Sequence, residues 1–228
     1  MQSTKNTKQI EQAQTKETNT GMNIRKINDP WLHTEVTEYF SFSEFKKIQE
    51  YFTALEIDTS SAINIHFEND KKYNGEVSSS HIISDVKSFN VKRQSIVCNE
   101  LDEIFKKRYK EYLTQCNINP EQDNYYFDFS LMIQPPNFLG HIHLDHACRA
   151  NTLIIHISEE GTGTGIYTDN NDDGFVKYTD WHPNGGVGWM SNEASWHRVV
   201  NNKSTDRYIF RSMLFDRNIP MPNGLKHA

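Results

Sequence analysis

The chain lacks a long hydrophobic run. Its longest apolar stretch, Thr152 to Ile157, is far shorter than the roughly 20 residues that a membrane-spanning helix needs. The first residues also lack the apolar segment of a secretory signal peptide. We therefore expect a soluble protein that stays in the cytoplasm and has no membrane partner.

Cysteine and net positive charge are also scarce. The three cysteines among 228 residues have no short paired spacing, which argues against a disulfide framework and against a CxxC metal site. The formal net charge is -6 at pH 7, so the chain offers no broad basic surface to a phosphate backbone. Nucleic acid is therefore an unlikely partner. No internal repeat is visible.

Large apolar side chains are nearly absent from residues 1–22, Ile10 aside. Such a segment cannot bury enough surface to offset the entropy lost on ordering it. We predict a flexible tail over residues 1–22 and a single domain over residues 23–228, because one domain typically contains up to about 200 residues. We expect a monomer or a weak homodimer.

Two segments in the first half have apolar residues at helical spacing. Residues 43–55 form one amphipathic pattern behind a serine, and residues 95–115 form a longer one that ends at the sequence Asn-Ile-Asn-Pro. Between them, residues 62–67 alternate as a strand does. Residues 23–122 are therefore predicted to be mainly helical support.

The chain changes character after residue 123. Short β-type runs, separated by Gly, Pro, Asn and Asp, follow one another at 125–134, 151–158, 163–168, 175–179, 186–190, 196–200 and 207–215. Many short strands with no helix between them predict a sandwich or barrel. The expected fold is mainly β with N-terminal helices (α+β), and residues 123–217 form the core.

The stretch GHIHLDHAC, residues 140–148, places three histidines and one aspartate close together. In a strand, His143 and Asp145 would project to the same face, which His141 would share while His146 points away. His197 follows in a later β-type run. Two imidazoles and a carboxylate on one face of an octahedron are typical of non-haem Fe(II) oxygenases. Arg207 then begins a core strand, where a buried guanidinium needs an anion such as a dicarboxylate.

These motifs resemble those of a known family. HLD at 143–145, SWHRV at 195–199 and DRYIFRSMLF at 206–215 are similar to the HxD…H…R signature of the Fe(II)- and 2-oxoglutarate-dependent dioxygenases, with a prolyl-hydroxylase-like branch as one option. The resemblance covers roughly residues 124–215 and implies a double-stranded β-helix, the jelly-roll core that cupins also have. It implies that His143, Asp145 and His197 bind iron and that Arg207 binds the distal carboxylate of 2-oxoglutarate.

The resemblance leaves some contacts open. Arg211, further along the same face of its strand, is the rival of Arg207 for 2-oxoglutarate, and Tyr126 and Asn151 are further candidates for contacting it. The implied reaction uses O2 as co-substrate, releases succinate and CO2, and hydroxylates an unactivated C–H bond. Asp145 favours hydroxylation, because the halogenating branch replaces this carboxylate by a small residue.

The substrate is open between a peptidyl or prolyl residue and a free amino acid or small metabolite, because substrate-binding loops vary freely on this scaffold. A nucleic-acid demethylase is a third option, prompted by the spacing of Arg211 and Arg217, but the acidic balance argues against it. A cupin would need a glutamate shortly after His143, and none occurs there.

A different function is suggested by residues 169–180. This segment fits the pattern of a calcium-binding loop, and the alternative to an enzyme is therefore a calcium-stabilised β-barrel that serves as an interaction module. An EF-hand needs a helix on each side, whereas the flanks here have strand patterns. The simpler interpretation is a polar hairpin turn with Gly174 at a positive dihedral angle. Trp181, Trp189 and Trp196 are expected in the core rather than in a substrate pocket.

Overall fold

The structure, a computed structural model, describes residues 21–54, 63–66, 92–95 and 99–220, and side chains only outside residues 55–99. A large sheet of eight strands runs through it. All neighbouring strands in it are antiparallel except β3 and β4. Their order is β1 (Asn23–Ile27), β2 (His33–Thr37), β10 (Gly186–Trp189), β7 (Arg149–His156), β13 (Arg207–Asp216), β5 (Tyr125–Gln134), β3 (Ile63–His66) and β4 (Lys92–Ser95).

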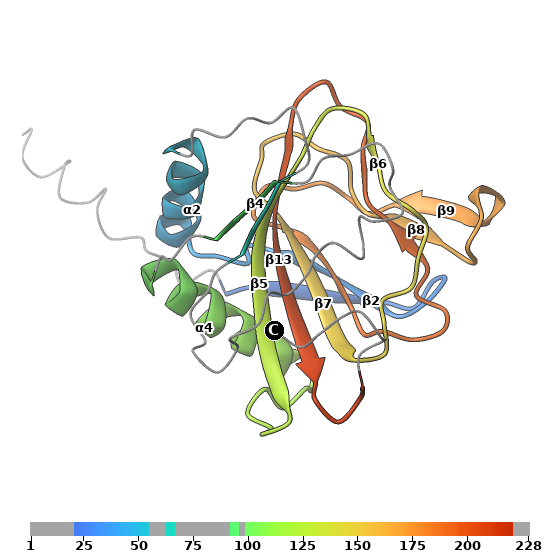
Figure 1. Ribbon diagram of the computed structural model, residues 1–228, viewed down its shortest axis with the longest axis horizontal. Coiled ribbons are helices and arrows are strands. Elements are labelled where there is room, and N and C mark those ends of the chain that lie inside the picture. The colour runs from blue at the N-terminus through green and yellow to red at the C-terminus, as the bar shows by residue number, and fades with distance from the viewer. Residues whose placement is uncertain (1–20, 55–62, 67–91, 96–98, 221–228) are drawn as a thin grey trace, which may run out of the picture.

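Shorter strands form the second layer of the barrel (Figure 1). A three-stranded sheet has the order β11 (His197–Arg198), β8 (Gly165–Tyr167) and β9 (Phe175–Tyr178), and β12 (Val200–Asn201) pairs with β6 (Phe138–Leu139). Ile166 of β8 is fully buried in a cluster with Ile154, Val187 and Ile209 of the large sheet. The two layers therefore enclose an apolar interior, as in a double-stranded β-helix.

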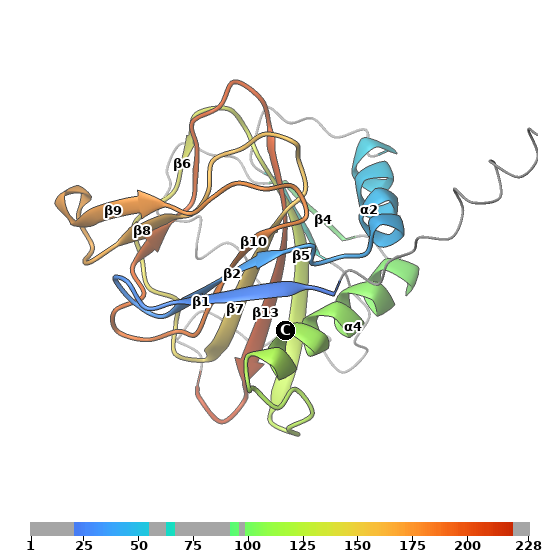
Figure 2. The same ribbon diagram turned by 180° about the vertical axis from the view of Figure 1, so that it is seen from behind.

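Two helices, α2 (Phe42–Ala54) and α4 (Asn99–Gln115), cover the other face of the large sheet (Figures 1 and 2). Helix α2 begins with a capping box, since the Ser41 amide donates to the Glu44 carboxylate at 2.8 Å while the Glu44 amide donates to Ser41 Oγ at 3.3 Å. Asn117, two residues after the last residue of α4, terminates the helix. Its φ of 63° lets the Ile118 amide donate back to the Leu113 carbonyl. Neither helix is long and apolar enough to span a bilayer.

The main core lies between these helices and the sheet. Phe105 of α4 stacks on Phe210 of β13 with ring centroids 4.0 Å apart, and both side chains are fully buried. Tyr112 of α4 approaches β10 so closely that a Cβ on Gly188 would lie 2.1 Å from its hydroxyl. Glycine is required there, because any side chain would push α4 away from the sheet.

The predicted fold class is confirmed, with differences at the edges of the elements. Strand β5 has the predicted bounds, while the predicted run 196–200 is split into β11 and β12. The helix predicted from residue 95 begins at 99, since Ser95 ends β4. Residues 23–37 were expected to be part of the helical support, but they form β1 and β2. In β2 the adjacent residues His33 and Thr34 are both buried, so the apolar–polar alternation of a half-buried strand is missing from the sequence.

The predicted tail over residues 1–22 lies outside the described residues except for its last two. Met22 is buried in the main core, so the packed domain includes at least this residue. Of the three cysteines, Cys148 is buried and Cys116 partly buried, and neither is in a disulfide, whereas Cys98 lies outside the described residues.

Candidate metal centre

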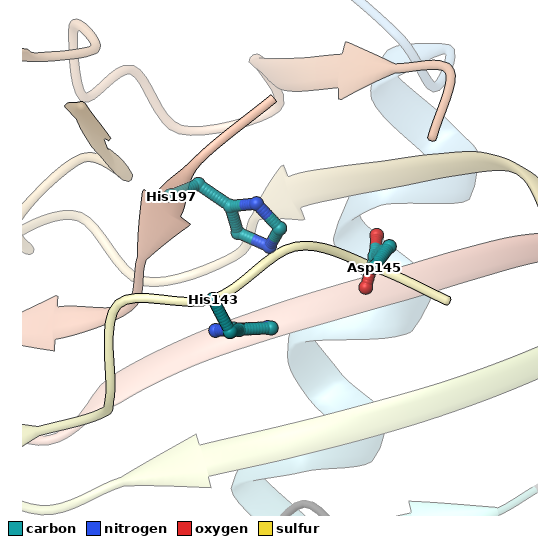
Figure 3. A group of neighbouring side chains, drawn as sticks. All are labelled: His143, Asp145 and His197. Atoms are coloured by element: carbon teal, nitrogen blue, oxygen red, sulfur yellow. The ribbon is translucent and has the colours of Figure 1, made fainter. Parts of the chain in front are cut away.

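His143 and His197 are held together by their own backbones. The His143 amide donates to the His197 carbonyl at 3.0 Å, and the His197 amide donates to the His143 carbonyl at the same distance. This bridge is isolated, so the segment carrying His143 and Asp145 is a loop rather than the expected strand. The imidazole centroids lie 4.3 Å apart, and Asp145 lies further along the same loop (Figure 3).

The three predicted ligands converge. One ligand atom from each of His143, Asp145 and His197 lies within 4.8 Å of the others. Within the described residues, no other group of three His, Cys, Asp or Glu side chains meets this condition. Two imidazole nitrogens and one carboxylate oxygen fit a facial triad for Fe(II), which leaves further positions for a chelating co-substrate and for oxygen.

Both imidazoles are oriented for metal binding through Nε2. The Nδ1 of His143 lies 3.0 Å from the carbonyl oxygen of His141, and the Nδ1 of His197 lies 2.8 Å from that of Ser195. Because a carbonyl only accepts hydrogen bonds, each Nδ1 carries the proton and each Nε2 keeps its lone pair. His141 thus acts through its backbone, while its side chain is exposed. His146 instead directs Nδ1 toward Cys148 Sγ at 3.2 Å.

Asp145 is buried and accepts three hydrogen bonds. Arg149 Nη1 lies 2.5 Å from Oδ1, and Thr152 Oγ1 and Trp189 Nε1 donate to Oδ2 at 2.7 and 3.0 Å. Burial on its own would raise the pKa of this carboxyl. The charge of Arg149 is the largest of the opposing influences, which together hold the pKa well below its usual range. Asp145 is therefore an anion at any physiological pH.

His197 is neutral near physiological pH. Burial lowers its pKa to about 4, because an imidazolium would lose its hydration there. His143 is only partly buried, at the open side of the group. A divalent cation would therefore displace no proton from the buried histidine and would meet one negative charge, from Asp145.

Arg207, predicted to bind a carboxylate, is fully buried at the start of β13. Its Nη1 donates to Gln134 Oε1 on β5, and its guanidinium carbon lies 5.2 Å from the ring centroid of Trp181. Nε and Nη2 are buried and have no acceptor among the described residues. His156 stacks on Trp181 with ring centroids 3.9 Å apart, and it is also fully buried. Buried donors without acceptors suit an anionic ligand.

The other predicted contacts fall in different places. Arg211 lies on the interior face of β13 with Arg207, and its Nε donates to Ser130 Oγ at 3.2 Å. Tyr126 stacks on Phe215, which lies eight residues beyond Arg207 on β13. At about 3.3 Å per residue, this places Tyr126 near the opposite end of the sheet from Arg207.

Asn151 faces away from the metal centre. Its Oδ1 accepts a hydrogen bond from the Tyr109 hydroxyl of α4 at 2.9 Å, and its Nδ2 donates to the Trp189 carbonyl at 3.0 Å. The alternation of side chains along β7 directs Asn151 to the helices and Thr152 to Asp145. The structure therefore does not bring Asn151 together with the predicted co-substrate residues.

Sequence reasoning missed the residues that surround the ligands. Arg149 and Thr152 follow Asp145 closely in the chain, but their contacts depend on how β7 lies against the loop. The alternation of Thr152, Ile154 and His156 along β7 was the available signal for an interior polar face. Gln134 could be found only through its pairing opposite Arg207.

The segment 169–180 contains the turn of the β8–β9 hairpin, with a short 3-10 helix at Asp172–Gly174, and strand β9 itself. No group of three potential ligands is found here within the described residues, and Asp172 pairs with Arg198 at 2.7 Å. Gly174 does not have the predicted positive dihedral angle. A Cβ there would lie 2.4 Å from Asp169 Oδ1, so the exposed Asp169 side chain would have to move. The geometry of this segment therefore gives no support to a calcium site.

Comparison with solved structures supports the fold. The chain is similar to the viral collagen prolyl hydroxylase of Paramecium bursaria Chlorella virus-1, solved as its 2-oxoglutarate complex, with 13% identity, 83% of this chain and 98% of that chain covered, and a TM-score of 0.52. This chain has the fold of the prolyl hydroxylases. A prolyl hydroxylase from Trichoplax adhaerens, in complex with a hypoxia inducible factor peptide fragment, gives a TM-score of 0.52 at 12% identity, with 83% of this chain and 87% of that chain covered. No family model matches the sequence, and no curated protein does.

Proposed function

We propose that the protein is a non-haem Fe(II)- and 2-oxoglutarate-dependent dioxygenase that hydroxylates an unactivated C–H bond of a peptidyl residue, an amino acid or a small metabolite. The observation that carries this proposal is the convergence of His143, Asp145 and His197 within 4.8 Å in the interior that Arg207 also lines. The prolyl-hydroxylase fold supports it, because the fold and the ligand set were identified by different observations.

Different residues would bind the metal and the co-substrate. His143 and His197 would hold iron through Nε2, and Asp145 would hold it through a carboxylate oxygen kept ionised by Arg149. Arg207 would bind the distal carboxylate of 2-oxoglutarate with the buried Nε and Nη2 donors. The surrounding apolar cluster would exclude water and strengthen these interactions.

When bound, iron supplies the centre at which O2 is reduced while 2-oxoglutarate is oxidatively decarboxylated. One oxygen atom enters succinate and the other enters the substrate, so that 2-oxoglutarate, O2 and R–H give succinate, CO2 and R–OH. Asp145 keeps a carboxylate where a halogenating enzyme would need space for a halide, so hydroxylation is the proposed outcome. On composition alone, we also propose that the protein acts in the cytoplasm as a monomer or weak dimer.

The test is anaerobic addition of Fe(II) and 2-oxoglutarate to the purified full chain. We expect a weak visible charge-transfer band from the chelated co-substrate, followed on admission of O2 by slow succinate formation without substrate. Asp145→Ala should lose both signals, because it removes the carboxylate ligand. His146→Ala is the matched control, since it removes a nearby histidine that lies outside the ligand group.

Absence of the band in the wild type, with the protein folded and iron present, would contradict the proposal. Retention of the band in Asp145→Ala would leave the enzyme assignment intact and would show that the ligand set is wrong.

A further inference from the structure

Strand β13 carries a second arginine on its interior face. Arg207 and Arg211 are four residues apart, so both side chains point to the same side and their Cα atoms are about 13 Å apart. Ile209 and Met213, the nearest residues on this face, are buried. Arg211 is partly exposed between them.

Protein atoms surround most of the Arg211 side chain. Burial by the surrounding protein lowers its pKa to about 10, so the guanidinium is crowded yet charged at neutral pH. A side chain on the outer surface would not be desolvated in this way. Ser130, its partner on β5, orients the guanidinium by accepting from Nε at 3.2 Å.

Arg211 lies closer to the metal ligands than Arg207 does. Thr152, which donates to Asp145, is paired with Met213, and Arg211 is only one interior position further along β13. The charges of Asp145 and Arg149 both act on Arg211. Arg211 is therefore within electrostatic reach of the metal ligands, on the same interior face of β13 as Arg207.

The charges facing the interior leave Arg211 without a dedicated anion. Asp145 is paired with Arg149, and in the proposed function Arg207 is paired with the distal carboxylate of 2-oxoglutarate. Arg211 makes no ion pair in the part of the chain that the structure describes, although the charge of Asp128, one interior position along β5 from Ser130, raises its pKa. A buried cation that is kept unpaired costs stability, unless a ligand supplies the anion.

We propose that Arg211 binds a carboxylate of the primary substrate, which is therefore a small carboxylic acid such as a free amino acid. This rests on the proposed function. The planar guanidinium fork matches a planar carboxylate, and one cation balances one carboxylate better than it balances a doubly charged phosphate. An internal prolyl residue of a peptide carries no carboxylate, so it could not make this contact.

The experiment uses the full chain with Fe(II), 2-oxoglutarate and O2. Each of the common free L-amino acids is compared with its carboxamide as a stimulator of succinate formation. At least one acid should stimulate turnover while its amide does not. Arg211→Gln should raise the KM for that acid by about 30-fold or more, because a buried carboxylate would lose its charged partner. Arg211→Lys should recover part of the loss, and Ser130→Ala should raise the KM less than Arg211→Gln does.

A second measurement separates the possible roles of Arg211. The Kd for 2-oxoglutarate is measured by calorimetry with Mn(II) in place of iron, without amino acid. Arg211→Gln should leave this Kd nearly unchanged, which also shows that the variant is folded. An equal weakening of 2-oxoglutarate binding in Arg211→Gln and in an Arg207 variant would overturn the proposal, because Arg211 would then bind the co-substrate. Stimulation by amides equal to that by acids, or by no acid at all, would also overturn it. Failure of the wild type to bind 2-oxoglutarate with Mn(II) would instead refute the proposed function.

Discussion

Replacement of Arg207 by methionine should have opposite effects on the ligand-free and the ligand-bound protein. Without ligand, Nε and Nη2 of Arg207 are buried donors with no acceptor in the described structure, and each costs about 1–3 kcal/mol. Methionine removes this cost together with that of burying the guanidinium charge, and it can keep the contact with Trp181. It also removes the charge-assisted bond to Gln134, worth about 1.5–3 kcal/mol, and leaves the buried Gln134 Oε1 without a donor, which costs about 1–3 kcal/mol more. The expected net gain is about 1–2 kcal/mol, which corresponds to a rise in Tm of about 2–8 °C.

The assay is thermal unfolding with Mn(II), with and without 2-oxoglutarate. At a ligand concentration of about 100 times Kd, binding should stabilise the wild type by about 2.7 kcal/mol. Arg207→Met should show no such shift, because the distal carboxylate would be buried without its cation. Lys203→Met is the matched control, since it removes one positive charge from an exposed turn shortly before β13. A lower Tm for ligand-free Arg207→Met, together with a full response to 2-oxoglutarate, would refute this reasoning.

Three further predictions concern neighbouring side chains. Asp145→Asn should weaken metal binding at least about 10-fold, measured by competition with a chelator, because the anionic ligand is lost. Burial, followed by the charge of Arg207, lowers the pKa of His156 well below its ordinary 6.5, so the stability that it contributes is complete above that pH and is lost as pH falls. Between pH 7.5 and 5.5, the free energy of unfolding of the wild type, measured by chemical denaturation, should fall by about 1 kcal/mol more than that of His156→Phe, whose ring can still stack on Trp181. Equal changes with pH in the two proteins would argue against a neutral His156. Asn151→Ala should cost about 1–3 kcal/mol in the same assay by removing the side-chain bonds to the Tyr109 hydroxyl and the Trp189 carbonyl, with no change in the Kd for 2-oxoglutarate; a weaker Kd would place Asn151 at the co-substrate after all.

The sequence predicted the elements whose patterns are long and local. Strand β5 and helix α2 were predicted to within a residue or so, because alternation and helical spacing repeat several times in each. Strands β1 and β2 were missed, because each has only five residues and depends on its neighbours to be a strand. Strand β1 pairs with β2, and β2 pairs with β10.

Some residues of the site could likewise be predicted from the sequence, and others could not. His143, Asp145 and His197 were found because their chemistry is specific, although the expected strand around His143 is a loop. Trp189 could not be predicted as a hydrogen-bond donor to Asp145, since the contact joins residues 44 positions apart in the chain. For Asn151, no pattern in the sequence indicates which face of β7 the side chain occupies.

The two faces of strand β13 differ in how well they should tolerate substitution. Phe210 and Leu214 point to the helices and hold the core, whereas Arg207 and Arg211 point to the interior. Substitution at Arg211 can therefore alter ligand preference with little effect on folding. Insertion of a single residue between Arg207 and Tyr208 would exchange the two faces for the rest of the strand, placing Arg211 in the core against the helices and Phe210 on the barrel side. Related sequences should therefore tolerate amino-acid exchange at position 211 far better than a change in the length of this strand.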